Sequence, residues 1–148
     1  MAGLKTITSA NSVFTIAVLP ILPVPFQVQG FASDDAFTVE PVDAAETIMG
    51  VDGIMSAGFL PFITPQTITL QADSPSIEIF ETWLSAQKAV KELFFAQGSI
   101  ALPSVQKSYI LTKGALKRIT QTPPARKTLQ PLVYQIDWND VQPVPLVL

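Results

Sequence analysis

Alternating apolar and polar positions recur along most of this chain. In residues 67–70 and 134–138 every second side chain is apolar, as in a strand with one buried face. Other short runs are rich in β-branched and aromatic residues and are bounded by turn-forming residues. Together these patterns predict strands at 13–18, 26–31, 46–49, 54–59, 67–71, 93–96, 99–102, 108–112, 115–120 and 132–138.

A single stretch, QADSPSIEIFETWLSAQ (71–87), has the spacing of a helix instead. Ile77, Phe80 and Leu84 lie three and four residues apart and predict the core-facing stripe of a helix over about residues 75–88. Such a helix is expected to cover an apolar opening at one flank of the β structure.

The start of this helix has its own signals. Ser74 suits the N-cap, and Pro75 suits the first helical position, where its missing N–H costs nothing. Trp83 lies beside the apolar stripe and is expected at the margin of the core or against a neighbouring molecule.

Glycine residues predict the turns between strands. The tetrapeptide Gly50-Val51-Asp52-Gly53 is expected to close a hairpin, as are Gln97-Gly98 and Lys113-Gly114, because glycine accepts positive φ. Residues 122–127 are expected to form a solvated loop. Many short strands with one helix predict a mainly β fold, a sandwich or partly open barrel.

Composition narrows the chemistry. The chain has 148 residues, which suits one domain, and contains neither cysteine nor histidine. Disulfides, thiolate metal sites and histidine-based catalytic triads are therefore excluded. Only 14% of the residues are charged while 48% are hydrophobic. Because such a surface is easily buried between subunits, we expect an oligomer rather than a monomer.

The apolar content does not indicate a membrane protein. No apolar run reaches the ~18 residues that a spanning helix needs. The nearest candidate, residues 13–26, contains Pro20, Pro23 and Pro25 and has no basic segment before it, so neither a membrane span nor a signal peptide is expected.

Charge is unevenly distributed along the chain. Residues 1–87 contain one basic residue, Lys5, and nine acidic ones, whereas residues 88–148 contain eight basic and three acidic residues. If this polarity persists in space, acidic and basic faces of identical subunits can pair head to tail, and such contacts generate rings or open stacks.

Candidate catalytic, metal and nucleic-acid sites are weak. Asp34 and Asp35 are adjacent, so on a strand they point to opposite faces and do not form a dyad. Asp52 lacks the alternating oxygen ligands of a calcium loop and fits a hairpin turn. The basic pairs 117–118 and 126–127 are expected on a surface or between subunits. Trp83 and Trp138 are expected to pack in the core or an interface rather than to stack on a sugar or base.

Four longer segments of the sequence resemble a known protein family. They are GFASDDAFTVEPVDAAETIMGVDGIMSAGF (30–59), ITLQADSPSIEIFETW (68–83), GSIALPSVQKSYILTKGALKRI (98–119) and LQPLVYQIDWNDV (129–141). Together they resemble tail tube proteins of contractile-tailed bacteriophages, and the resemblance covers most of the chain.

The resemblance implies a single tail tube-like domain over residues 1–148, without catalytic residues, metal or cofactor. It implies a virion protein, assembled in the host bacterial cytoplasm, whose hexameric rings stack into a tube inside a contractile sheath. The implied partners are further copies of itself, the sheath, baseplate and tail-terminator proteins, and genomic DNA passing through the lumen.

Acidic residues suit such a channel, because carboxylates repel phosphates whereas lysine and arginine hold them. We expect some of six residues to face the lumen or a ring-to-ring junction: Asp34, Asp35, Glu40, Asp43, Glu46 and Asp52.

Three alternatives remain at this point. The first is another virion part, such as a tube-like baseplate or adaptor subunit, a terminator or a capsid decoration protein. The second is a monomeric β-barrel that binds a small ligand or sugar near Trp83 or Trp138. A carboxylate-based hydrolase is the third alternative, although no spaced acid pair is visible.

Overall fold

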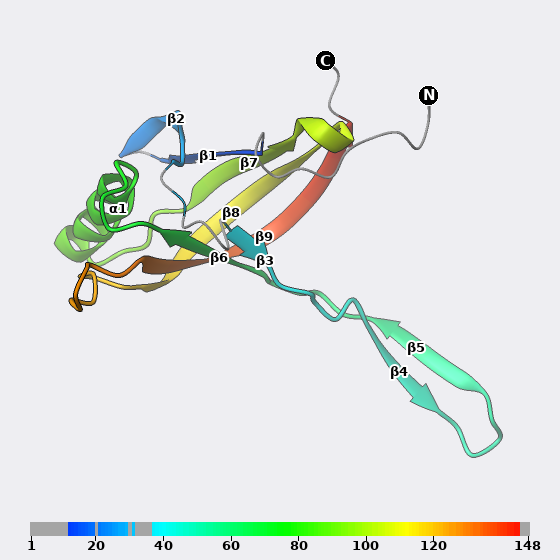
Figure 1. Cartoon of the computed structure of the whole chain (residues 1–148). Coiled ribbons are helices and arrows are strands. Elements are labelled where there is room, and N and C mark those ends of the chain that lie inside the picture. The colour runs from blue at the N-terminus through cyan, green and yellow to red at the C-terminus, as the bar shows by residue number, and fades with distance from the viewer. Residues whose placement is uncertain (1–11, 20, 30, 32–36, 146–148) are drawn as a thin grey trace.

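The fold is a curled antiparallel β-sheet with one helix and one projecting hairpin (Figure 1). The computed structural model describes residues 12–19, 21–29, 31 and 37–145. Seven strands form the main sheet in the order β2-β1-β7-β8-β9-β6-β3, and β4 and β5 form a separate pair. The strands of the main sheet are β1 Val13–Val18, β2 Leu22–Gln27, β3 Phe37–Val39, β6 Thr64–Leu70, β7 Ala96–Leu102, β8 Lys107–Ile119 and β9 Leu132–Pro145.

The sheet folds over on itself without closing. Figure 1 shows β1 and β2 on one side of the core and β6 and β3 on the other, joined through β7, β8 and β9. Near the two ends of the sheet, Phe14 of β1 and Phe37 of β3 approach with ring centroids 5.7 Å apart. The prediction of a mainly β, partly open fold with one helix is therefore confirmed.

Two predicted hairpins are wrong. Gln97-Gly98 lies inside β7, and Lys113-Gly114 lies inside β8, where the register shifts by one residue. This β-bulge bends β8, and Lys113 adopts a φ of 50° there. The actual β7–β8 turn is the 3₁₀ segment η1, Pro103–Val105. The predicted strands 108–112 and 115–120 are thus one strand.

Residues 22–27, which include two prolines, form an edge strand that the sequence does not predict. The predicted strand at 26–31 is displaced, because β2 spans Leu22–Gln27 and includes Pro23 and Pro25. Proline lacks the N–H that another strand would need, so it is tolerated at an edge and blocks further pairing there. Residues 93–95 likewise lie outside the strands, since β7 begins at Ala96.

Helix α1 spans Ile77–Val90, two residues later at each end than predicted. Ser76, not Ser74, occupies the N-cap position, and its hydroxyl accepts a hydrogen bond from Gln29 N–H at 2.7 Å instead of capping the helix. The Ser74 hydroxyl donates to the Gln29 carbonyl oxygen. These serines therefore fasten the start of α1 to the segment after β2.

The stripe on α1 packs into the core, and it is wider than predicted. Ile77 and Phe80 are buried, and Leu84 is partly buried against the same core. Trp83 is fully buried, so its expected place at the margin is wrong. Its indole N–H donates to the Phe94 carbonyl oxygen at 2.9 Å, and this bond allows the polar edge of the ring to be buried.

Trp138 of β9 packs in the hydrophobic core against the central strands of the sheet. Its indole N–H donates to Gln66 Oε1 at 2.8 Å, and both side chains are fully buried. The ring lies directly over Gly114 and close to Gly98, where β7 and β8 have no side chains. Among the described residues, Gln66 Nε2 finds no hydrogen-bond acceptor. The two glycines therefore make room for a tryptophan rather than forming turns.

Tyr134 makes the stability of the fold sensitive to alkaline pH. It stacks on Phe80 at a centroid distance of 4.3 Å, and burial together with the charge of Glu81 raises its pKa from 10.0 to about 12. Between pH 10 and 12 the unfolded chain ionises this phenol while the folded chain does not. We therefore expect the free energy of unfolding to fall by about 2–3 kcal/mol across this window.

Urea denaturation at pH 9 and pH 12, followed by circular dichroism, measures this fall. Tyr134→Phe is the matched control, because it keeps the stacked ring and removes the ionising hydroxyl. Other effects of alkaline pH are common to both proteins. An equal loss of stability in parent and variant would contradict the assignment to Tyr134.

Candidate assembly interface

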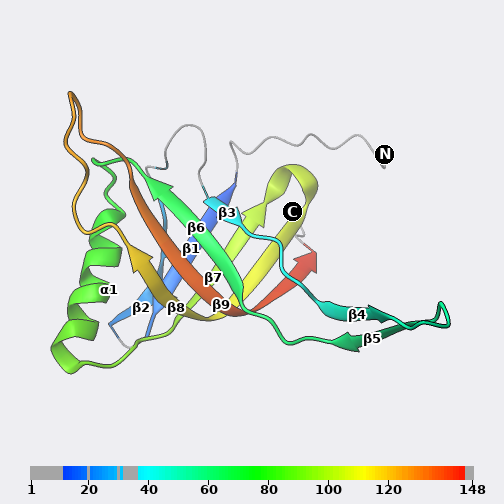
Figure 2. The same ribbon diagram turned by 90° about the horizontal axis from the view of Figure 1, so that it is seen from below.

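The most exposed part of the molecule is a two-stranded arm. It consists of β4 Ala45–Met49 and β5 Met55–Phe59, which pair in antiparallel register and project away from the main sheet (Figures 1 and 2). Every residue of both strands is exposed. Because an isolated hairpin is only marginally stable in water, an arm of this kind needs a surface to pack against.

The turn at the tip is the one predicted from the glycines. Gly50 N–H donates to the Ile54 carbonyl oxygen at 2.9 Å, and Gly53 has a φ of 82°. Asp52 Oδ1 accepts a hydrogen bond from Ile54 N–H at 3.1 Å. Asp52 is therefore a turn residue, as expected.

One face of the arm is more apolar than the other. Side chains of directly paired residues share a face, and successive residues alternate between faces. The pairs Ala45–Phe59, Thr47–Ala57 and Met49–Met55 therefore lie on one face, whereas Glu46–Gly58 and Ile48–Ser56 lie on the other. We call the first set the apolar arm face. Its largest side chain, Phe59, is 80% exposed.

The structure gathers four of the six predicted acidic residues on this arm and its base. Glu40 and Asp43 precede β4, Glu46 lies on β4, and Asp52 lies at the tip; all four are exposed. Residues 40–63 contain no lysine or arginine. Asp34 and Asp35 lie outside the described residues. The sequence indicates these acids as a group but does not place them on a projecting element.

A second exposed apolar surface lies where α1 ends and β7 begins. A groove of about 430 Å³ is lined by Leu19, Leu93, Phe94, Phe95, Ala96, Gln97, Thr112 and Lys113. We call it the α1–β7 groove. Leu19, Leu93 and Phe95 are each 43–56% exposed. Residues 93–97, which supply most of its lining, join the end of α1 to the start of β7, and the end of α1 lies on the opposite side of the molecule from the arm (Figure 2).

Two hydrogen bonds join Phe94, which lines this groove, to side chains of α1. Phe94 N–H donates to Gln87 Oε1 at 3.1 Å, and the Phe94 carbonyl oxygen accepts the bond from Trp83. The main chain of Phe94 is thus bonded to α1 and its side chain packs against the core, whereas Leu93 and Phe95 are exposed. The Lys113 ammonium lies 5.2 Å from the centre of the Phe95 ring, a cation–π contact.

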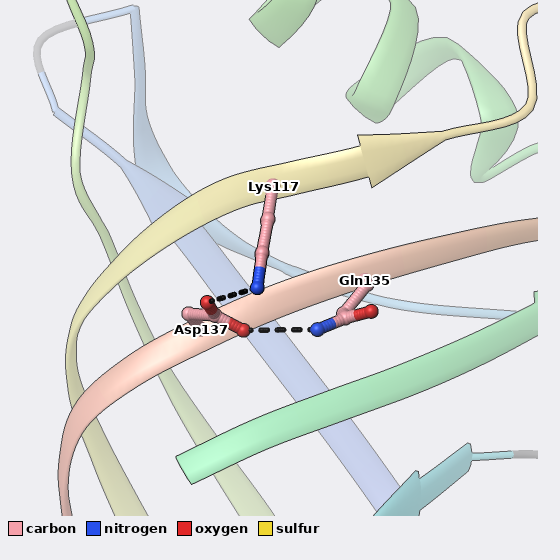
Figure 3. Close-up of polar contacts among 3 residues, drawn as sticks. All are labelled: Lys117, Gln135 and Asp137. Atoms are coloured by element: carbon pink, nitrogen blue, oxygen red, sulfur yellow. Dashed lines mark hydrogen bonds and ion pairs between the residues drawn. The ribbon is translucent and has the colours of Figure 1, made fainter. Parts of the chain in front are cut away.

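The outward face of the central strands β8 and β9 carries a small cluster of polar contacts. Lys117 of β8 lies 3.6 Å from Asp137 Oδ2 of β9, and Gln135 Nε2 donates to Asp137 Oδ1 at 3.1 Å (Figure 3). Lys117 and Arg118 are exposed, as are Arg126 and Lys127 in the 121–131 loop. These basic pairs are therefore on the surface, as expected.

Inside the curled sheet, a small cavity opens near β3. It measures about 220 Å³ and is lined by Phe37, Val39, Ile100, Leu102, Tyr109, Leu111 and Val141. Apart from Tyr109 these residues carry no polar side-chain group that would orient a ligand. Trp83 and Trp138 do not line it, and both are buried and hydrogen-bonded, so neither presents a stacking surface for a sugar.

Metal-binding clusters are missing from the described residues. These contain no group of three or more acidic side chains that would hold a metal ion. Within the same residues, no helix is long and apolar enough to cross a membrane. The two exposed apolar surfaces are therefore the acidic arm and the α1–β7 groove, which Lys113 lines.

Comparison with the profiles of known protein families shows which family this chain belongs to. The profile of the family described as Tail fiber protein gp32 matches residues 5–142. The chain belongs to this family. A comparison with curated protein sequences finds no match.

Solved structures with the same fold come from contractile injection systems. A chain of the anti-feeding prophage cap, which terminates the tube, aligns with a TM-score of 0.64 and 8% identity over 98% of this chain and 95% of that chain. A chain of the six-fold symmetrised anti-feeding prophage baseplate gives 0.60 and 12% over 97% and 99%. A chain of the PVC sheath/tube terminator in the extended state gives 0.60 and 11% over 88% and 92%.

This gp32-family chain therefore shares its fold with components of contractile tail-like machines. At 8–12% identity the likeness establishes the fold and not the position within the machine. The resemblance to contractile-tail proteins, seen first in the sequence, is supported at this level by both family and fold.

The sequence does not predict that the arm or the α1–β7 groove is an exposed apolar surface. Runs such as IMGVDGIM (48–55) read as ordinary hairpin strands, since periodicity does not show whether a strand has a core to cover. A usable signal is present: Met49, Val51, Ile54 and Met55 are apolar on both sides of the turn, where solvent-exposed hairpins normally carry polar residues.

Proposed function

We propose that this chain is a non-enzymatic structural subunit of a contractile phage tail, and specifically a tail tube subunit. In this proposal six copies form a ring, rings stack into a tube inside the sheath, and genomic DNA passes through the central channel. Its partners are other copies of itself and the sheath, baseplate and tail-terminator proteins.

The observation that carries the proposal is the arm. Five large apolar side chains on its strands, Ile48, Met49, Met55, Phe59 and, at the turn, Val51, are 59–112% exposed and touch no core. Large apolar side chains that gather on one projecting element without covering a core indicate a contact with another protein. Family membership and the shared fold support a tail particle as the setting.

A second position in the tail is favoured by particular fold relatives. Chains of a tube-terminating cap and of a baseplate share this fold, so a terminator or baseplate adaptor is the alternative. The family description names a tail fiber, which is a third arrangement.

The purified full-length chain, viewed by negative-stain microscopy, separates these positions. A tube subunit is expected to give open stacks of six-fold rings with a stain-filled channel. Single closed rings would indicate a terminator or baseplate subunit, and thin solid threads would indicate a fibre. A monomer at all concentrations in sedimentation velocity would overturn the proposal of self-assembly.

Acidic residues are expected to face the channel or the junction between rings. Glu40, Asp43 and Glu46 are exposed at or near the arm, where they would repel DNA phosphates rather than bind them. An electrostatic map of an assembled ring tests this, and a channel lined mainly by lysine and arginine would reject it.

A further inference from the structure

We propose that the tip of the arm of one copy docks into the α1–β7 groove of the next copy. This inference rests on the proposed self-assembly and names the contact that drives it. The tip is residues 49–55, and the groove is the surface defined above between the end of α1 and the start of β7.

Both surfaces are apolar and unpartnered in the single chain. Met49, Val51, Ile54 and Met55 at the tip are 59–112% exposed. In the groove, Leu19, Leu93 and Phe95 are exposed, and its volume of about 430 Å³ accommodates several side chains of this size. The groove is also preformed, since two hydrogen bonds fix Phe94, and a preformed site loses less conformational entropy on binding.

The charges of the two surfaces are complementary. The tip carries Asp52, and the whole segment 40–63 is acidic without a basic residue. Lys113 lines the groove, and two exposed charged residues, Lys91 and Glu92, come just before Leu93 at the end of α1, so two basic side chains and one acidic one surround this surface. Within the described residues the ion pair found is Lys117–Asp137, so neither Lys91 nor Lys113 is engaged by a carboxylate of that part of the chain. Complementary charges of this kind select partner and register.

The geometry makes the contact self-propagating. The arm and the end of α1, beside which the groove lies, are on opposite sides of the molecule in both views (Figures 1 and 2), so the arm of one copy cannot reach its own groove. A copy that donates its arm to one neighbour leaves its groove free for another. Such a heterologous contact builds rings or open stacks, whereas a two-fold contact would stop at a dimer.

Cysteine cross-linking tests the contact directly, because the chain contains no cysteine of its own. The full-length V51C/L93C variant, treated with a short bismaleimide reagent, is expected to give a ladder of covalent multimers. The V51C/K127C variant is the matched control, since Lys127 is equally exposed but lies in the 121–131 loop. A ladder from the first variant alone supports the proposal.

The other outcomes separate this contact from the proposed function. Rings or tubes visible by microscopy without a V51C/L93C ladder would overturn the contact and leave the tube function intact, with another tail protein or another face covering the tip. A protein that does not assemble at all would overturn both.

A charge exchange adds a second readout. D52K and K113D are each expected to raise the concentration needed for half-assembly about tenfold, and the D52K/K113D double variant is expected to recover most of this loss. Because K113D also removes the contact with Phe95, its thermal unfolding is measured in parallel. Additive losses without recovery would show that these two side chains do not face each other.

Discussion

Replacing Gly114 with alanine is expected to destabilise the fold by about 3 kcal/mol. A Cβ atom at this position would lie 2.5 Å from Cζ3 and 2.6 Å from Cε3 of Trp138, far inside van der Waals contact. The ring cannot move aside, because it is fully buried and its indole N–H is bonded to Gln66. Gly98 is a related case, since a Cβ there would lie 2.9 Å from the Thr15 carbonyl oxygen and 3.2 Å from Cη2 of Trp138.

Urea denaturation monitored by circular dichroism measures this loss. Gly58→Ala is the matched control, since a Cβ on Gly58 meets nothing within 4 Å and the arm lies outside the core. Combining Gly114→Ala with Trp138→Leu should cost less than the sum of the two single changes, because the smaller side chain relieves the overlap. A Gly114→Ala protein within about 0.5 kcal/mol of the parent would show that the sheet relaxes freely here.

Removing the apolar arm face is expected to abolish assembly without weakening the single subunit. The triple change Met49→Ser, Met55→Ser and Phe59→Ser deletes three side chains that are 59–80% exposed and touch no core. Burying each of them at an interface contributes about 1.5–3 kcal/mol, so the concentration needed for assembly should rise at least ~100-fold. The midpoint of thermal unfolding of the monomer should stay within about 2 °C of the parent, since exposed positions carry little folding energy.

Ile48→Ser is the control for this experiment. Ile48 is 63% exposed on the same arm but lies on the opposite face, paired with Ser56. Sedimentation velocity of both variants separates a loss of the apolar arm face from a general loss of hydrophobicity. Normal rings from the triple variant, or equal defects in both variants, would refute the role of this face.

Much of the fold follows from local patterns. The strand at Val13–Val18 and the alternation along 132–138 each mark a face that must be buried, and one amphipathic segment stands out as the helix. These inferences hold because a period of two or of three to four is a property of the chain itself. The GVDG turn is equally local, since only its own glycine has to accept positive φ.

Other features depend on what lies across the sheet. In the sequence, Gly98 and Gly114 are typical of turn residues. In the structure they lie within strands and leave space for the ring of Trp138, which belongs to the later strand β9. Trp83 is buried because the carbonyl oxygen of Phe94 reaches its N–H, which periodicity cannot indicate. Pro23 and Pro25 argue against a strand until the sheet edge that tolerates them is known.

The sequence by itself determined a cysteine-free, histidine-free, mainly β chain with one helix, an acidic first part and a basic second part, because composition and short-range periodicity need no partner. Only the tertiary structure decided which apolar residues stay uncovered. The same alternating pattern packs β6 into the core and leaves β4 and β5 in solvent, since burial depends on the neighbours that the topology supplies. It also decided that the acidic arm and the end of α1 lie on opposite sides (Figure 2), because segments distant in sequence are placed by the fold of the sheet.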